Sequence, residues 1–128
     1  MNIIVVDASS TVRSKIEELL LAMDFEDLDI QTFSNASDAL DYSRDTDIDL
    51  IFSAIETEGL DGVSFVESLL NDNPKYVSHL FIVTSQKNTE NMLEIKDIGA
   101  KRFIPKPINE EYFNHFVKQE IDKIINGL

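Results

Sequence analysis

The 128-residue sequence has no cysteine, only 3 prolines and 4 glycines, and no long apolar run. Without cysteine, the chain can form neither disulfide bonds nor zinc sites with thiolate ligands. No apolar stretch approaches the roughly 20 residues that a membrane-spanning helix needs. No basic residue precedes Asp7 at the start of the chain, so we expect no signal peptide and a cytoplasmic protein.

Basic residues are scarce as well. The chain has 11 Lys and Arg residues against 24 Asp and Glu residues, which gives a formal net charge of −13. Such a surface repels the phosphate backbone of nucleic acids, so we expect no direct nucleic-acid binding. The acidity is interpreted mainly as a source of solubility, with a basic partner surface as the alternative.

The motifs of small α/β enzymes are also missing. No glycine-rich phosphate loop follows the first apolar segment, and there is no nucleophile elbow. His79 and His115 have no metal-ligating partner at a useful spacing. We therefore expect a non-enzymatic chain with no cofactor. A small α/β enzyme or a flavin carrier is the alternative that the sequence supports least.

Five short apolar segments recur along the chain. Those that are apolar on nearly every residue are typical of strands with both faces covered. One segment alternates, as an edge or half-exposed strand does, and the last one is short and stops at Pro105. The covered segments are Ile3–Val6, Ile48–Phe52 and Leu80–Val83; the alternating one is Leu28–Phe33, and the last is Lys101–Ile104.

Helical periodicity separates these segments. The first helix carries an apolar stripe from Val12 to Met23, with Ser9 or Ser10 as its N-cap. The boundaries of the others are a start at Asn35–Asp38 with an end near Arg44, a stop at Asn73–Pro74, a C-cap at Gly99 and a start at Asn109. This order predicts one (βα)5 domain over residues 1–128, with a doubly wound parallel five-stranded sheet of the flavodoxin-like kind.

In such a sheet, functional residues lie at the carboxyl ends of the strands. Four of these ends are Asp7–Ala8, Ser53–Ala54, Thr84–Ser85 and Pro105–Lys106.

These strand ends carry a resemblance to the receiver domain of bacterial response regulators, of the chemotaxis-regulator type. Each matching motif is weak alone, but together they are correctly spaced and cover essentially the whole chain. The motifs are Val5–Ser9 with Arg13, Gly59–Gly62, Val83–Ser85, and Gly99–Ala100 through Phe103–Pro107. The resemblance implies a role in two-component signal transduction, with protein partners.

Two acids of the receiver motif are absent. The family's phosphoacceptor lies eight residues before Gly62, which places it at Ala54. The second acid of the opening pair, a direct metal ligand in the family, is Ala8. A methyl group can neither attack phosphorus nor bind magnesium, which prefers carboxylate oxygens. The resemblance therefore implies a degenerate pseudo-receiver without a functional magnesium site, in which Asp7, Thr84 and Lys106 keep the other pocket positions.

The remaining pocket residues have structural interpretations too. Thr84 and Phe103 match the family's switch positions, but Thr84 is interpreted mainly as a packing and hydrogen-bonding residue and Phe103 as a buried core ring. The resemblance also implies a cis peptide bond between Lys106 and Pro107. A buried ammonium needs a partner, and we rank Asp7 first for Lys106, solvent second and Glu56 third.

We expect a phosphorylation-independent signalling module that acts through protein contacts. In the family the partner surface comprises the fourth helix, fifth strand and fifth helix, which here are Asn88–Asp97, Arg102–Ile104 and Asn109–Ile125. The last segment has more apolar positions than one buried stripe needs, so part of it should be exposed as an interface, possibly between two copies. The interface candidates are Met92, Phe103, Tyr112, Phe113, Phe116 and Val117. The alternative is a receiver that a histidine kinase phosphorylates at Asp7, Glu56 or Asp61.

Overall fold

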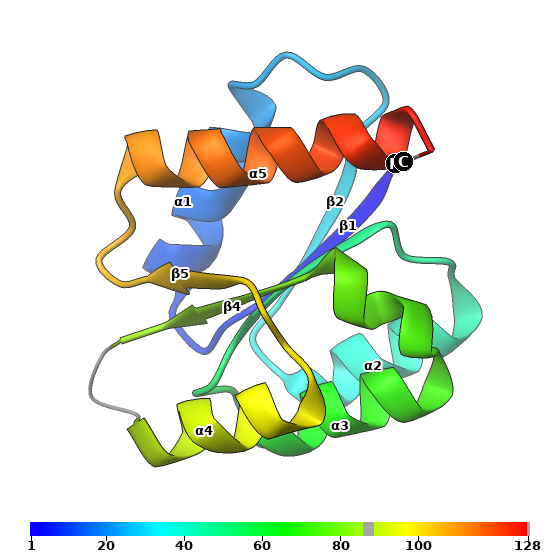
Figure 1. The fold of residues 1–128 in the computed structure, drawn as a ribbon, viewed down its shortest axis with the longest axis vertical. Helices are drawn as coiled ribbons and strands as arrows, with labels where there is room; N and C mark the ends of the chain where they lie inside the picture. Colours follow the sequence, from blue (N-terminus) through cyan, green and yellow to red (C-terminus); the bar gives the residue numbers. More distant parts are fainter. Residues whose placement is uncertain (86–88, 128) are drawn as a thin grey trace.

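A parallel sheet of five strands forms the centre of the computed structural model, which describes residues 1–85 and 89–127. The strand order is β2-β1-β3-β4-β5, so the expected doubly wound, flavodoxin-like fold is confirmed (Figure 1). The strands are β1 (Asn2–Val6), β2 (Asp29–Phe33), β3 (Leu50–Ala54), β4 (Leu80–Thr84) and β5 (Phe103–Pro105). No helix in the described ranges is both long and apolar enough to span a membrane.

Helices cover both faces of this sheet. One face carries α1 and α5, and the other carries α2, α3 and α4 (Figure 1). Their bounds are α1 (Ser10–Leu21), α2 (Ala36–Asp45), α3 (Gly62–Asp72), α4 (Thr89–Ile98) and α5 (Glu110–Ile125). A 3₁₀ helix, η1 (Pro74–His79), joins α3 to β4 and was not expected from the sequence.

Alternating residues of each strand enter one of two apolar cores. In β1, Ile3 and Val5 face the core under α1 and α5, whereas Ile4 and Val6 face the other core. On the α5 side, the Phe52 ring stacks on Phe81 and Phe113, with centroid distances of 5.4 and 5.6 Å. Because both faces are buried, the strands are apolar on consecutive residues, as the sequence predicted.

Short-range hydrogen bonds define the helix starts. Ser9 accepts from the backbone N–H of Val12, Asn35 from those of Ser37 and Asp38, and Asn109 from that of Tyr112. These contacts confirm the expected helix starts, and they show that the N-cap of α1 is Ser9 and not Ser10. At the other end of α4, Gly99 has a φ of +123°, in agreement with the expected C-cap.

Two strands begin two residues later than expected. β3 starts at Leu50 instead of Ile48. The Asp49 carboxylate accepts a hydrogen bond from the backbone N–H of Asn2 at 2.7 Å, so regular pairing with β1 begins only after Asp49. β5 starts at Phe103 instead of Lys101, and it extends through Pro105, which pairs with Thr84. Proline is tolerated at that position because β5 is an edge strand. The alternating β2 lies at the opposite edge, as expected.

The N-terminus of α3 generates a stability prediction. Asp61 caps this helix by accepting hydrogen bonds from the Ser64 backbone N–H and hydroxyl, both at 2.9 Å. The pKa of Asp61 is lowered, chiefly by the backbone hydrogen bond from Ser64, against the opposing effect of partial burial. A lowered pKa stabilises the fold above the unfolded-state value, and this contribution is lost as the pH falls through the folded-state value.

We expect Asp61→Ala to reduce the free energy of unfolding by about 0.5–2 kcal/mol at neutral pH. The difference from the parent should shrink as the pH drops from about 4 downward, because the parent's carboxylate is then protonated. Urea unfolding across this pH range measures it. Glu67→Ala, which removes an exposed acid of the same helix outside the cap, serves as the control. A pH-independent loss would contradict the charged cap.

Candidate functional site

Four predicted pocket residues meet at the carboxyl edge of the sheet. Asp7 follows β1, Ala54 and Thr84 end β3 and β4, and Lys106 follows β5. The strand register aligns these ends, since Ala54 pairs with Val83 and Thr84 pairs with Pro105. We call these four residues and Ala8, which follows Asp7, the strand-end pocket.

An ion pair dominates the strand-end pocket. The Lys106 ammonium lies 2.8 Å from Asp7 Oδ2, and the Asp7 side chain is only 3% exposed. Asp7 Oδ1 accepts a hydrogen bond from the backbone N–H of Ser9 at 2.9 Å, whereas Oδ2 faces the Lys106 ammonium. The charge of Lys106 is therefore what compensates that buried oxygen. Asp7 was the first-ranked partner, and this prediction is confirmed.

The lysine itself is held by its backbone. The Lys106 N–H donates to the carbonyl oxygen of Thr84 at 2.9 Å, which continues the pairing between β4 and β5. The peptide bond between Lys106 and Pro107 is cis, as expected. The Lys106 side chain remains 22% exposed, so the ion pair is less deeply buried on the lysine side than on the Asp7 side.

The two alanines leave the pocket without the acids that a metal site would use. Ala54 is buried at the end of β3, and Ala8 is exposed in the β1–α1 turn. Within the described ranges, no group of three or more acidic, histidine or cysteine side chains could hold a metal ion. The carboxylate of Asp7 is already paired with Lys106. These donors do not fit a magnesium ion, which needs several hard oxygen ligands.

Hydrogen bonds to backbone atoms hold together the loops around the strand-end pocket. The Ala8 N–H donates to the Glu56 carbonyl oxygen at 3.3 Å, which joins the β1–α1 turn to the β3–α3 loop. Arg13 Nη1 donates to the carbonyl oxygens of Asp7 and Ala8 at 2.7 and 3.3 Å. On the far side, Gly62 donates its N–H to Ile55, and a Cβ at Gly62 would collide with the carbonyl oxygens of Ala54 and Ile55. The loops are therefore packed directly against both alanine positions.

Thr84 and Phe103, the switch positions of the family, differ in burial. Thr84 is buried, and its hydroxyl donates to the Ser85 carbonyl oxygen at 3.1 Å, in agreement with its interpretation as a hydrogen-bonding residue. Phe103 was expected to be a buried core ring, and this expectation is wrong, because its ring is only partly buried on the edge strand. Lys96 Nζ lies 5.3 Å from the centroid of this ring.

The other acids of the alternative phosphorylation hypothesis lie outside the ion pair. Glu56 is exposed in the loop that follows β3. Asp61 is the N-cap of α3, and its carboxylate oxygens accept hydrogen bonds from Ser64.

Only some of the predicted interface residues are exposed. Phe113 and Val117 are fully buried against the sheet, so their side chains cannot contribute to an interface. Tyr112 and Phe116 are 39% and 43% exposed, and their ring centroids lie 4.6 Å apart. Helix α5 thus has two adjacent apolar stripes, of which only the second reaches the surface. Met92 and Phe103 are half-buried, Leu93 of α4 is exposed, and Asn88 lies outside the described residues.

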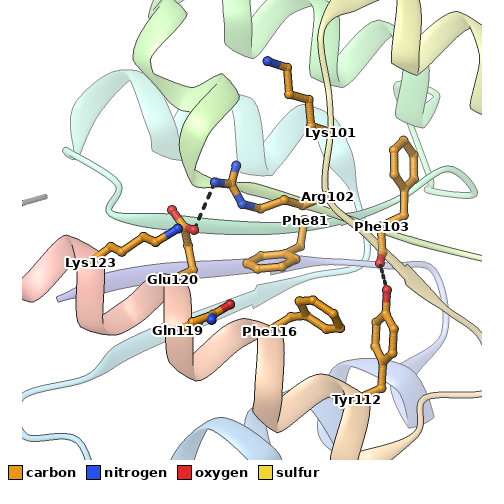
Figure 2. A pocket seen from close by; sticks show the side chains of 9 residues that line it. All are labelled: Phe81, Lys101, Arg102, Phe103, Tyr112, Phe116, Gln119, Glu120 and Lys123. Atoms are coloured by element: carbon orange, nitrogen blue, oxygen red, sulfur yellow. Dashed lines mark hydrogen bonds and ion pairs between the residues drawn. The ribbon is translucent and has the colours of Figure 1, made fainter.

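A second ion pair was not predicted from the sequence. Glu120 of α5 is buried, and its Oε2 lies 3.1 Å from Arg102 Nη2, immediately before β5. The sequence signal was present but weak, because Glu120 is one of several charged residues of α5 and lies next to Ile121 on its buried side. Beside this pair lies a hollow of about 240 Å³ between β5 and α5, which we call the β5–α5 pocket (Figure 2).

Comparisons with known proteins agree with this geometry. Residues 3–118 match the response regulator receiver domain family. A protein-glutamate methylesterase/protein-glutamine glutaminase of Syntrophomonas wolfei is 30% identical over 122 residues, which cover 94% of this chain and 34% of that protein. The chemotaxis protein CheY-3 of Vibrio cholerae is 23% identical over 128 residues, which cover 100% of this chain and 94% of that protein.

A solved structure shows the same fold. A CheY-like response regulator receiver domain protein of Methanospirillum hungatei superposes with a TM-score of 0.82 at 19% identity, covering 99% of this chain and 98% of that one. The chain belongs to the response regulator receiver domain family, and it is a receiver domain of two-component signalling. It spans about a third of the length of the methylesterase relatives that it matches.

The ion pair of the strand-end pocket yields a stability prediction. We expect Lys106→Met to lower the free energy of unfolding by about 1–3 kcal/mol, because it leaves the buried Asp7 carboxylate without its charge partner. The double variant Asp7→Asn with Lys106→Met should recover part of this loss. Urea unfolding of the four species forms a double-mutant cycle.

Lys75→Met, which removes an exposed lysine outside the strand-end pocket, is the control and should change stability by less than about 0.5 kcal/mol. A Lys106 variant as stable as this control would show that the ion pair contributes nothing to the fold.

Proposed function

We propose that this receiver domain signals without being phosphorylated and acts through contacts with a protein partner. The observation that carries the proposal is Ala54 at the end of β3, where the family places its phosphoacceptor. Because a methyl group has no lone pair to attack phosphorus, phosphoryl transfer at this position has no chemical basis. The module is accordingly non-enzymatic.

The charge balance of the strand-end pocket supports this proposal. In an active receiver, the lysine faces several acids and later a phosphoryl group. Here Lys106 has one buried acid, Asp7, at 2.8 Å, and the pair is neutral as a whole. An electrostatic switch needs a change of charge. With no group to accept the phosphoryl charge, the pocket stays in a single charge state.

Phosphorylation at another acid is the competing hypothesis. Asp7 is buried against Lys106, and Asp61 is engaged in the cap of α3, so each would first have to break existing contacts. Glu56 lies in the exposed loop beyond Ala54. In-line phosphoryl transfer also needs a metal to neutralise charge, and the described donors do not fit one.

The partner is a protein, either another regulator, a kinase-related protein or a second copy of the chain. The exposed Tyr112 and Phe116 of α5 and Leu93 of α4 support contact through the α4-β5-α5 face. The formal charge of −13 argues against nucleic acid as the partner. The cytoplasmic location expected from the sequence remains a prediction.

Phosphorylation is tested directly with acetyl phosphate or phosphoramidate and magnesium, followed by intact-mass spectrometry. We expect no phosphoryl adduct on the native chain. A double variant, Ala8→Asp with Ala54→Asp, restores both acids to backbone positions that the fold keeps, and it should gain an acid-stable, base-labile adduct. An adduct on the native chain, mapped to Asp7, Glu56 or Asp61, would establish the competing hypothesis instead.

Thermal unfolding gives an independent measurement. A ligand that binds only the folded state raises its melting temperature. Millimolar magnesium with beryllofluoride should leave the melting temperature of the native chain unchanged beyond ordinary salt effects, whereas it should raise that of the Ala8→Asp, Ala54→Asp variant. A specific rise for the native chain would show that a functional metal site persists.

A further inference from the structure

The β5–α5 pocket combines an aromatic floor with a basic rim. Figure 2 shows the rings of Phe81, Phe116 and Tyr112 among the residues that line it. Phe81 is almost fully buried, whereas Phe116 and Tyr112 are 43% and 39% exposed. The volume of about 240 Å³ suits one large apolar side chain of a partner.

The lining of the β5–α5 pocket has more basic than acidic residues. Three of the chain's 11 basic residues line it, namely Lys101, Arg102 and Lys123, although the formal charge of the whole chain is −13. Arg102 is paired with the buried Glu120 at 3.1 Å, so the one acid of the lining is already neutralised. Within the described ranges, Lys101 and Lys123 form no ion pair with another residue, and both are exposed. The rim therefore presents a local positive charge on an acidic protein.

The adjacent sheet edge is a poor site for strand addition. β5 has only three residues, and the Phe103 carbonyl oxygen accepts a hydrogen bond from the Tyr112 hydroxyl at 3.1 Å (Figure 2). Strand addition needs a row of unpaired backbone groups. One of the few backbone acceptors of β5 therefore already has a hydrogen-bond partner. This geometry favours insertion of a partner's side chain between β5 and α5 over addition of a strand.

We propose that the β5–α5 pocket binds a protein segment that carries an aromatic side chain next to carboxylates. The aromatic group would displace water from the exposed rings of Phe116 and Tyr112, and the carboxylates would lie against Lys101 and Lys123. A central buried aromatic anchor with a charged rim is the arrangement in which few residues carry most of the binding energy. This inference rests on the proposed function, since it specifies the chemistry of the protein partner.

Fluorescence titration can test the pocket, because the chain contains no tryptophan. The probe is a capped peptide with a central tryptophan flanked by aspartate and glutamate, excited where tyrosine does not absorb. We expect saturable binding that weakens as salt is added. Replacing the acids of the peptide with asparagine and glutamine, or its tryptophan with alanine in a labelled peptide, should weaken binding by about tenfold or more.

Variants of the chain locate the binding site. Lys101→Glu with Lys123→Glu should weaken binding of the acidic peptide by about tenfold or more. The matched control is Lys15→Glu with Lys75→Glu, which makes the same change of charge at lysines of α1 and η1, outside the α4-β5-α5 face and outside the pocket lining, and it should stay within about twofold of the parent. Phe116→Ala tests the aromatic floor without any change of charge and should also weaken binding. Circular dichroism melts verify that each variant is folded.

Several outcomes would overturn the assignment: absence of binding, equal binding of the neutral peptide, or equal losses in the Lys101/Lys123 variant and its control. Dimerisation in sedimentation experiments that requires Phe116 would assign the pocket to a second copy instead. Acetyl phosphate with magnesium, added to the titration, separates the two proposals. If it changes the affinity of the native chain, phosphorylation independence fails while the pocket assignment stands.

Discussion

Burial of the parallel sheet on both faces is the constraint on which the rest of the molecule depends. Side chains of β1, β3 and β4 enter two separate cores, so none of these strands can shift by one residue without exchanging its cores. The register that results brings all strand ends to one edge. The strand-end pocket is therefore a product of core packing, and it keeps its shape whether or not the side chains at its edge retain their chemistry.

The contact between Asp7 and Lys106 follows from this arrangement. β1 and β5 are separated in the sheet by β3 and β4, so a direct contact between their ends has to cross the strand ends of Ala54 and Thr84. The long side chain of Lys106 spans this distance and reaches Asp7. Where they meet, the positive charge of the half-buried Lys106 offsets part of the desolvation cost of the buried Asp7 carboxylate. The same pair that satisfies the fold also fixes the electrostatics of the site.

The sequence was sufficient where local chemistry or topology determines the outcome. The N-caps Ser9, Asn35 and Asn109 are short-range signals, and the partner of Lys106 follows from the order of the strands. Phe113 and Val117 were misplaced because two apolar stripes lie side by side on α5, and only tertiary packing decides which one faces the sheet. The ion pair of Arg102 and Glu120 joins two elements that meet only in the folded chain, and its sequence signal, an acid beside Ile121 on α5, was too weak to predict it. The burial of Phe103 was overestimated, because a side chain on an edge strand has a neighbouring strand on one side only.

The close packing of Gly62 has a consequence for motion. Its N–H is bonded to Ile55, and its Cα lies against the backbone of Ala54 and Ile55, so the start of α3 and the end of β3 are joined without an intervening side chain. This contact couples the start of α3 to the end of β3, so the amide of Gly62 should exchange its hydrogen as slowly as those of the central strand. A displacement at the start of α3 would therefore be transmitted to the backbone of Ala54.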